Sequence, residues 1–289
     1  MTPETIRFVT DGGADAPTKE AEKYKVTVVS LEVNIYDNKS KETRVLDVNE
    51  DLLPIMVADP DLKPKTSAPS GGAFLKAYED IPEKEIISVH IFSSKSATYK
   101  NAEWAADQIN NSPETYGEKH VTVYDSQTAS IATWALVRRG FLSPKTDVTK
   151  IVEDIEDARK RLTFYAILQD PKYAAQKDDN FTQDIAKVLA SKLKIKPTIT
   201  VIDNKFHVVH QGLSKNNMVT DLIKKINNSG PLEEIGIGHF GAIDAARRAQ
   251  DELSQTHSFE IPIYDIKQLI SAYGGPGAIG IYTIKKKVA

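Results

Sequence analysis

Two short hydroxyl-rich segments contain the side chains best suited to holding an anion. Residues 64–70 read Pro-Lys-Thr-Ser-Ala-Pro-Ser. The prolines stiffen this segment, so the hydroxyls of Thr66 and Ser67 are donors at fixed positions. Hydroxyl groups and the free backbone N–H groups of a helix start suit a carboxylate or a phosphate. The second segment, residues 93–98, adds four more hydroxyls, those of Ser93, Ser94, Ser96 and Thr98.

Helix capping is the competing interpretation of both segments. A serine or threonine just before a helix accepts a hydrogen bond from a backbone N–H group of the first turn. The capping candidates are Thr66, Ser67 and Ser70 for a helix expected near residues 73–78, and Ser94 and Ser96 for one expected over residues 97–109. The sequence leaves both interpretations open for each segment.

A third segment is rich in glycine. Residues 274–278 read Gly-Gly-Pro-Gly-Ala, and Gly275 and Gly277 would let the backbone approach a ligand closely. The segment lacks the Gly-Lys-Ser/Thr ending of a phosphate-binding P-loop. Taken alone, it is interpreted as a turn.

Classical catalytic arrangements are not evident. The sequence has no cysteine and no Gly-x-Ser-x-Gly motif. His90 and Ser93 have opposite parity in an expected strand, so their side chains point to opposite faces. His207 and His210 have the same spacing, which disfavours a shared metal ion. With no carboxylate partner to name for any histidine, we predict no catalytic residue and no metal site.

The first half of the chain alternates strands and helices. Helices are expected near residues 73–78, 97–109 and 128–141, and buried strands at residues 6–10, 26–31, 86–92 and 121–124. This alternation is typical of βαβ units with a parallel sheet, in which ligands bind outside the carboxyl ends of the strands. Residues 93–98 follow the strand at 86–92 and are expected at such an end.

The second half has a different pattern. A charged helix over residues 149–161 is expected to bridge two domains, and Asp203-Asn204 signals a hairpin between two strands. Strands are expected at residues 164–168, 198–202, 205–210 and 278–284, and helices at 184–193, 218–226 and 243–253. We therefore predict an α/β protein: a Rossmann-like domain with a mainly parallel sheet over residues 1–162 and a smaller α+β domain over residues 163–289.

Composition narrows the classes of function. The 289 residues include 37 basic and 40 acidic side chains, and no basic stripe typical of nucleic-acid binding is visible. No stretch approaches the roughly 20 apolar residues that span a bilayer, so no integral membrane association is expected. The N-terminus has no secretory signal pattern. We expect a cytoplasmic protein.

Ordered motifs along nearly the whole chain resemble the DegV family of bacterial fatty-acid-binding proteins. These are Val9-Thr10-Asp11, Val28-Val29-Ser30-Leu31, residues 64–70, Ser96-Ala97-Thr98-Tyr99, Tyr124-Asp125-Ser126, Lys194-Ile195-Lys196-Pro197 and Gly275-Pro276-Gly277-Ala278. The resemblance implies an EDD-type fold that encloses one long-chain fatty acid, with no other cofactor. It implies that Thr66, Ser67, Ser93 and Ser96 hold the carboxylate and that an apolar tunnel holds the acyl chain. Adjacent positions would be Asp11, Ser94, Thr98, Tyr273, Gly275 and Gly277.

The sequence departs from the family pattern at the positions that the resemblance assigns to contact with a fatty acid kinase. The arginine-containing segment after the first strand of the second domain corresponds to residues 176–180, Gln-Lys-Asp-Asp-Asn, and a second arginine-rich segment to residues 210–214. Tyr273 stands where the family usually has histidine, and residues 11–13 read Asp-Gly-Gly in place of Asp-Ser-Thr. We therefore expect the lipid site to be retained and the role as kinase substrate to be weakened or lost.

Three functions remain open from the sequence. The leading one is a non-enzymatic carrier of one fatty acid. The second is a hydrolase or acyltransferase that uses Ser93 or Ser96, which requires a general base that the sequence does not identify. The third is a diverged protein-interaction module without a lipid site.

Overall fold

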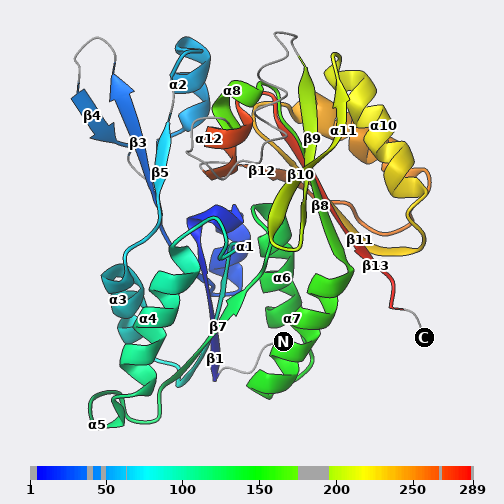
Figure 1. Cartoon of the computed structure of the whole chain (residues 1–289). Coiled ribbons are helices and arrows are strands. Elements are labelled where there is room, and N and C mark those ends of the chain that lie inside the picture. The colour runs from blue at the N-terminus through cyan, green and yellow to red at the C-terminus, as the bar shows by residue number, and fades with distance from the viewer. Residues whose placement is uncertain are drawn as a thin grey trace. The chain divides into compact units, whose positions relative to one another are not determined.

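The structure is a computed structural model, and it describes residues 5–37, 42–46, 50–62, 64–174, 195–266 and 269–287. The helix expected over residues 184–193 and the altered segment 176–180 lie outside the described residues. The chain forms two compact units (Figure 1). The first comprises Met1–Glu32 and Ser67–Lys160, and the second comprises Val33–Thr66 and Arg161–Ala289.

The first unit is built on a sheet of four parallel strands in the order β2-β1-β6-β7. These strands are β1 (Ile6–Asp11), β2 (Thr27–Val29), β6 (Glu85–His90) and β7 (His120–Asp125). The chain runs from β1 to β2 on one side and later returns to β6 on the other side of β1. The strand order therefore reverses between β1 and β6, which is the position where open α/β sheets bind ligands.

Helices α3 (Gly71–Asp80) and α4 (Thr98–Asn110) of the first unit bury an apolar stripe each against this sheet. In one core cluster, Phe74 and Tyr78 pack with Ala102, Val9 and Ile86, all fully buried. The helices are η1 (Gly12–Ala14), α1 (Thr18–Lys23), α3 (Gly71–Asp80), α4 (Thr98–Asn110), α5 (Pro113–Tyr116), α6 (Ile131–Phe141) and α7 (Val148–Arg161). The predicted Rossmann-like sheet is confirmed.

The second unit contains a six-stranded sheet in the order β10-β9-β8-β13-β11-β12. Its neighbouring strands are antiparallel except for β11 and β12, which confirms the predicted α+β character. Asp203 and Asn204 have φ of 48° and 60°, as a two-residue hairpin turn requires. The strands are β8 (Leu162–Ile167), β9 (Lys196–Ile202), β10 (Lys205–Gly212), β11 (Leu232–His239), β12 (Ile263–Asp265) and β13 (Ile279–Lys285).

Two helices bury their apolar stripes against one face of that sheet. Leu222 of α10 and Ala246 of α11 share a core cluster with Ile167, Ile237 and Ile281 of the strands. The helices of this part of the unit are α8 (Pro171–Ala174), α10 (Lys215–Asn227), α11 (Ile243–Ser254) and α12 (Leu269–Gly274).

The segment 33–66 differs from the expected domain division, which assigned all residues up to 162 to the first domain. It groups with the C-terminal residues and makes the second unit the larger one. Its elements are β3 (Glu32–Asp37), β4 (Glu42–Val45), α2 (Leu52–Ala58) and β5 (Lys65–Ser67), with the strands in the order β4-β3-β5. A physical link is the hydrogen bond that the Tyr173 hydroxyl donates to the Pro60 carbonyl, at 2.9 Å. Long-range bonds of this kind have no signature in the local sequence.

In the part of the chain that the structure describes, no helix combines the length and the apolar character needed to cross a bilayer.

Candidate functional site

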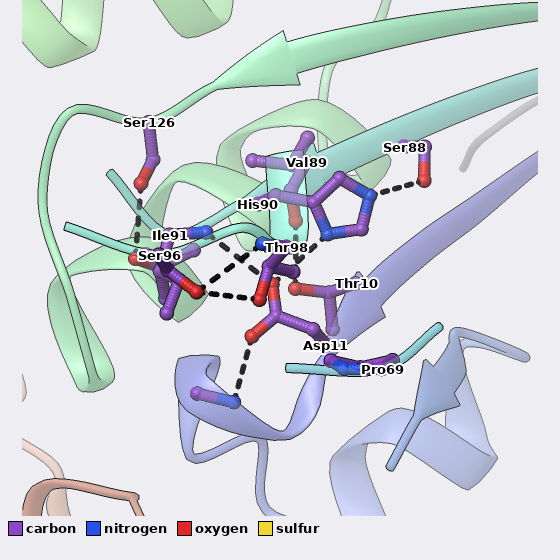
Figure 2. A network of polar contacts seen from close by, with 12 residues as sticks. Thr10, Asp11, Pro69, Ser88, Val89, His90, Ile91, Ser96, Thr98 and Ser126 are labelled. Atoms are coloured by element: carbon purple, nitrogen blue, oxygen red, sulfur yellow. Dashed lines mark hydrogen bonds and ion pairs between the residues drawn. The ribbon is translucent and has the colours of Figure 1, made fainter. Parts of the chain in front are cut away.

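A buried network of polar side chains lies where the strand order reverses (Figure 2). Asp11 ends β1 and His90 ends the neighbouring parallel strand β6. Oδ2 of Asp11 lies 2.9 Å from Nδ1 of His90 and accepts the Ile91 backbone N–H at 3.3 Å. Oδ1 accepts the Gly13 N–H at 2.8 Å and so caps the short helix η1. Asp11 therefore joins the carboxyl ends of two strands.

The network continues from His90 into the core of the first unit. Nε2 of His90 lies 2.7 Å from Oγ of Ser88, which accepts the Tyr78 hydroxyl at 2.8 Å. Because carboxylate oxygens only accept hydrogen bonds, Nδ1 of His90 carries a proton and donates it to Asp11. Since Ser88 accepts from Tyr78, its own hydroxyl hydrogen is left to be donated to Nε2 of His90. Burial raises the pKa of Tyr78, so the phenol remains a donor. Every member of the chain Tyr78, Ser88, His90 and Asp11 is thereby satisfied.

The order serine, histidine and aspartate matches the connectivity of a hydrolase triad, but burial excludes that role. Ser88, His90, Asp11 and Tyr78 are all 0% exposed, so no substrate reaches the Ser88 hydroxyl. The network instead fixes the ends of β1 and β6. Leaving a buried polar group of such a network without its partner costs free energy, so the four side chains are held in place and the network acts as a rigid support for the strand ends.

The sequence alone names no carboxylate partner for His90, and the structure identifies that partner as Asp11. The expectation that His90 and Ser93 form no couple agrees with the structure, in which Ser93 bonds to Asp125. The serine beside His90 is Ser88, which has the same parity in the strand and lies on the same face. A signal was present in the sequence: Asp11 and His90 each end a buried strand. In a parallel sheet such ends lie at one edge.

Ser93 is directed toward a carboxylate of the protein itself. Its hydroxyl donates to Oδ2 of Asp125 at 2.5 Å, and its backbone N–H donates to Oδ1 at 3.2 Å. Oδ1 also accepts the Gln127 N–H at 2.9 Å, so Asp125, at the end of β7, braces the segment that follows β6. A ligand carboxylate that uses the Ser93 hydroxyl must therefore compete with Asp125.

Ser96 and Thr98 form a pair at the start of α4. Their hydroxyl oxygens lie 2.7 Å apart, and Oγ of Ser96 accepts the Thr98 backbone N–H at 3.2 Å (Figure 2). Thr98 is buried, Ser96 is half-buried and Ser94 is exposed. The N-cap of α4 is Ala97, which has no side-chain cap, so Ser96 is not the N-cap and instead makes a local turn with Thr98 just before the helix. In the same helix, the Asn101 amide donates to the Pro69 carbonyl at 2.8 Å, which joins α4 to residues 67–70 of the first unit.

The hydroxyls of residues 64–70 have different roles. Ser70 caps α3, because its Oγ accepts the Ala73 N–H at 3.1 Å. The division between the two units falls between Thr66 and Ser67. Within the second unit, Oγ1 of Thr66 lies 2.7 Å from the hydroxyl of Tyr273 in α12. Ser67 ends β5 and is exposed.

The glycine-rich segment is a tight turn in the second unit. Gly275 and Gly277 have φ of 72° and 95°, a region that favours glycine. A Cβ atom on Gly275 would lie 2.3 Å from Cδ2 of Tyr173, so glycine is also needed for space. Residues 275–280 match Gly-x-Gly-x-x-Gly in spacing, but they lead into the strand β13 and open no helix. They are therefore not a dinucleotide-binding motif.

The described residues contain no group of three or more His, Asp or Glu side chains arranged to hold a metal ion. What the strand-end segment offers is hydroxyl groups and backbone N–H groups beside a rigid buried network. Such groups bind and orient an anion, and they fit no particular covalent chemistry.

Comparison with known proteins agrees with this architecture. The model of a family described as "Uncharacterised protein, DegV family" matches residues 5–286. A DegV domain-containing protein of Staphylococcus aureus strain N315 is 25% identical over 296 residues, covering 99% of this chain and 100% of that protein.

Solved structures share the fold at lower sequence identity. A stearic acid-binding protein from Eubacterium ventriosum has a TM-score of 0.82 and 19% identity, covering 96% of this chain and 98% of its own. The Fak B3 protein of the Streptococcus pneumoniae fatty acid kinase, loaded with linoleic acid, has a TM-score of 0.78 and 17% identity, covering 98% and 100%. The family model spans nearly the whole chain, and the fold is the same from end to end: the chain belongs to the DegV family.

Proposed function

We propose that this chain binds one long-chain fatty acid and carries it without transforming it. The observation that carries the proposal is the placement of the hydroxyl-rich segment 93–98. It follows β6 at the point of strand-order reversal, on a fold shared along the whole chain with a stearic acid-binding protein. The resemblance to the DegV family assigns the carboxylate to these hydroxyls and to those of Thr66 and Ser67, and it assigns the acyl chain to an apolar tunnel.

Ser96 is the hydroxyl best suited to meet the carboxylate. The Ser96–Thr98 pair has two hydroxyl hydrogens and uses one of them in the contact between the two side chains. When buried Thr98 donates to Ser96, the hydrogen on the half-buried Ser96 remains for the ligand. Ser93 is secondary in this scheme, because its hydroxyl already donates to Asp125.

The acyl chain would supply most of the affinity. At about 0.8 kcal/mol per buried CH₂ group, a sixteen-carbon chain gives on the order of 10 kcal/mol before the costs of binding. Each hydrogen bond to the charged head group adds about 1.5–3 kcal/mol. The hydroxyls therefore orient the ligand and select for the free acid.

An acyl hydrolase is the less favoured function. The only triad-like array among the described residues is buried Ser88–His90–Asp11, and His90 is fully engaged there. Asp125 contacts Ser93, but two backbone N–H groups and one hydroxyl already use its oxygens. Among the described residues, neither His90 nor Asp125 is thus placed to take a proton from Ser93 or Ser96 repeatedly.

Mass spectrometry of lipid extracted from the purified protein tests the proposal. We expect one fatty acid per chain, strongly depleted in a Thr66→Ala, Ser96→Ala variant and retained in a Ser94→Ala control, because Ser94 is exposed. A wild-type protein that is empty and gives no thermal shift with added oleate would remove the lipid function. Equal depletion in the control would remove the assignment of the head-group residues.

The proposed protein partner is a fatty acid kinase, and we expect its interaction with this chain to be weakened. The likeness to a Fak B3 protein supports the idea, whereas Tyr273 in place of the usual histidine opposes it. Residues 176–180, another of the altered segments, lie outside the described residues. We expect slow or no phosphorylation of the bound acid by such a kinase, and efficient turnover would refute the weakened role.

A further inference from the structure

A second polar site lies at one end of the six-stranded sheet of the second unit. Strands β8, β10 and β11 end there and strands β9 and β13 begin there, as the pairing of Ile167 with both Thr198 and Ile279 shows. Because α10 follows β10 and α11 follows β11, both helices start at this end. Their first turns add positive electrostatic potential and free N–H groups to it.

Three cationic side chains converge at this end. Nζ of Lys196 donates to the Gln169 carbonyl at 2.9 Å, and Nζ of Lys215 lies 3.5 Å from the Gly277 carbonyl. Gln169 and Gly277, whose carbonyl groups contact the two lysines, are themselves neighbours: a Cβ atom built on Gly277 would lie 3.2 Å from Cγ of Gln169. The guanidinium of Arg248, in α11, donates a hydrogen bond to Oδ1 of Asn216 at 3.2 Å. Asn216 is the residue next to Lys215 in α10.

Nothing within the described chain neutralises this cluster. None of Lys196, Lys215 and Arg248 forms an ion pair with a carboxylate in the part of the chain that the structure describes. Burial lowers the pKa of Lys215, and the charges of Arg248 and Lys196 lower it further. The three cations therefore repel one another, and a bound anion would relieve that repulsion.

An unpartnered buried hydroxyl points to a ligand at the same place. Thr198 is 1% exposed, and its Oγ1 has no hydrogen-bond partner. It lies two residues after Lys196 in β9, so both side chains are on the face that α10 covers, with Ile167 as the cross-strand neighbour. Oε1 of Gln169 is also buried without a partner. Buried polar atoms left unpaired are rare enough to require an explanation.

His239, at the end of β11, does not belong to the proposed set. Its Nδ1 is buried without a hydrogen bond, but it lies 3.8 Å from Oδ1 of Asp265. Burial lowers the pKa of the imidazole, so the ring is neutral near pH 7 and adds no positive charge to the three cations.

We propose that Lys196, Lys215 and Arg248, with the hydroxyl of Thr198, form a binding site for a phosphate group. Two ammonium groups and one guanidinium match the charge and the several acceptor oxygens of a phosphate dianion. The phosphate is either free inorganic phosphate or the head of a small phosphomonoester. This site lies wholly within the second unit and does not depend on the proposed fatty-acid function, so either one can fail alone.

Calorimetric titration of the full chain with inorganic phosphate, at constant ionic strength in chloride, tests the site. We expect saturable binding that is weakened about tenfold or more in Lys215→Gln and in Arg248→Gln. Lys205→Gln is the matched control, because Lys205 is exposed and pairs with Ile202 at the opposite end of the sheet. Thermal unfolding of each variant confirms that it is folded.

A parallel titration with phenyl phosphate identifies the source of the phosphate. Tighter binding than inorganic phosphate assigns the site to phosphorylated molecules, and equal or weaker binding assigns it to free phosphate. The site is refuted when neither compound saturates. It is also refuted when Lys205→Gln weakens binding as much as Lys215→Gln does, because that result indicates diffuse surface charge.

Discussion

Replacing Asp11 with asparagine tests the buried network with almost no change in side-chain shape. Asparagine keeps one carbonyl oxygen and puts an NH₂ group in place of the other carboxylate oxygen. When the carbonyl continues to accept the Gly13 N–H, the NH₂ group faces the Ile91 N–H and Nδ1 of His90. His90 can move its proton to Nε2, but the Ile91 N–H then has no acceptor, and Ser88 must reverse its hydrogen bond.

The expected loss of unfolding free energy follows from these contacts. One buried N–H group left without an acceptor costs about 1–3 kcal/mol, and a disturbed Ser88–His90 bond adds about 1 kcal/mol. We expect Asp11→Asn to lose about 3 kcal/mol, a large part of the roughly 5–15 kcal/mol of a typical domain. Tyr78→Phe removes only the donor to Ser88 at 2.8 Å and is expected to lose about 1 kcal/mol.

Urea unfolding followed by tryptophan fluorescence measures both losses. The chain has two tryptophans, Trp104 and Trp134, and both lie in the first unit, so the signal reports that unit alone. The slope with urea must stay the same in all three proteins for the free energies to be comparable. Asp11→Asn losing no more than Tyr78→Phe would refute the assigned roles.

Two further outcomes concern local geometry and pH. Gly275→Ala should lower the free energy of unfolding by about 3 kcal/mol, because the left-handed backbone and the clash with Tyr173 both destabilise the variant. The control Gly230→Ala, with φ of 98° and nothing within 4 Å of the added Cβ atom, should lower it by about 1 kcal/mol. Equal losses of the two variants in denaturant unfolding would contradict the clash. The hydrogen bond from Arg159 lowers the pKa of Glu156 from 4.5 to about 2, so this carboxylate stabilises the fold above pH 4.5 and the contribution is lost as the pH falls toward 2. The stability difference between wild type and Glu156→Gln should therefore shrink over that range, and a constant difference in unfolding measurements would show that the ion pair is not responsible.

The sequence predicted the elements whose residue pattern is long and regular. The helices α4 and α6 and the strands β6 and β7 were expected close to their observed bounds, because a continuous apolar period or a β-branched run marks them. The strands of segment 33–66 were missed. β4, for example, consists of four exposed residues and has no apolar alternation to detect. β11 was missed as well, because two glycines and two acidic residues weaken its strand pattern.

The chemistry of the candidate site was accessible from residue types, but its hydrogen-bond partners were not. The sequence identified hydroxyl groups at the end of β6, and the structure shows that Ser93 donates to Asp125 and that Ser96 pairs with Thr98. It also placed Tyr273 near the site only by resemblance, whereas the structure joins its hydroxyl to Thr66, 207 positions earlier in the chain.

What the sequence alone determined is the class of fold and the kind of ligand group that its loops suit, because periodicity and residue chemistry are local properties. Only the tertiary structure decided that His90 is a buried support bonded to Asp11, 79 residues away, and that Lys196, Lys215 and Arg248 gather at one sheet end. The physical reason is that strand order and helix packing set the neighbours of a side chain. A hydrogen bond between distant positions leaves no trace in the spacing of either residue.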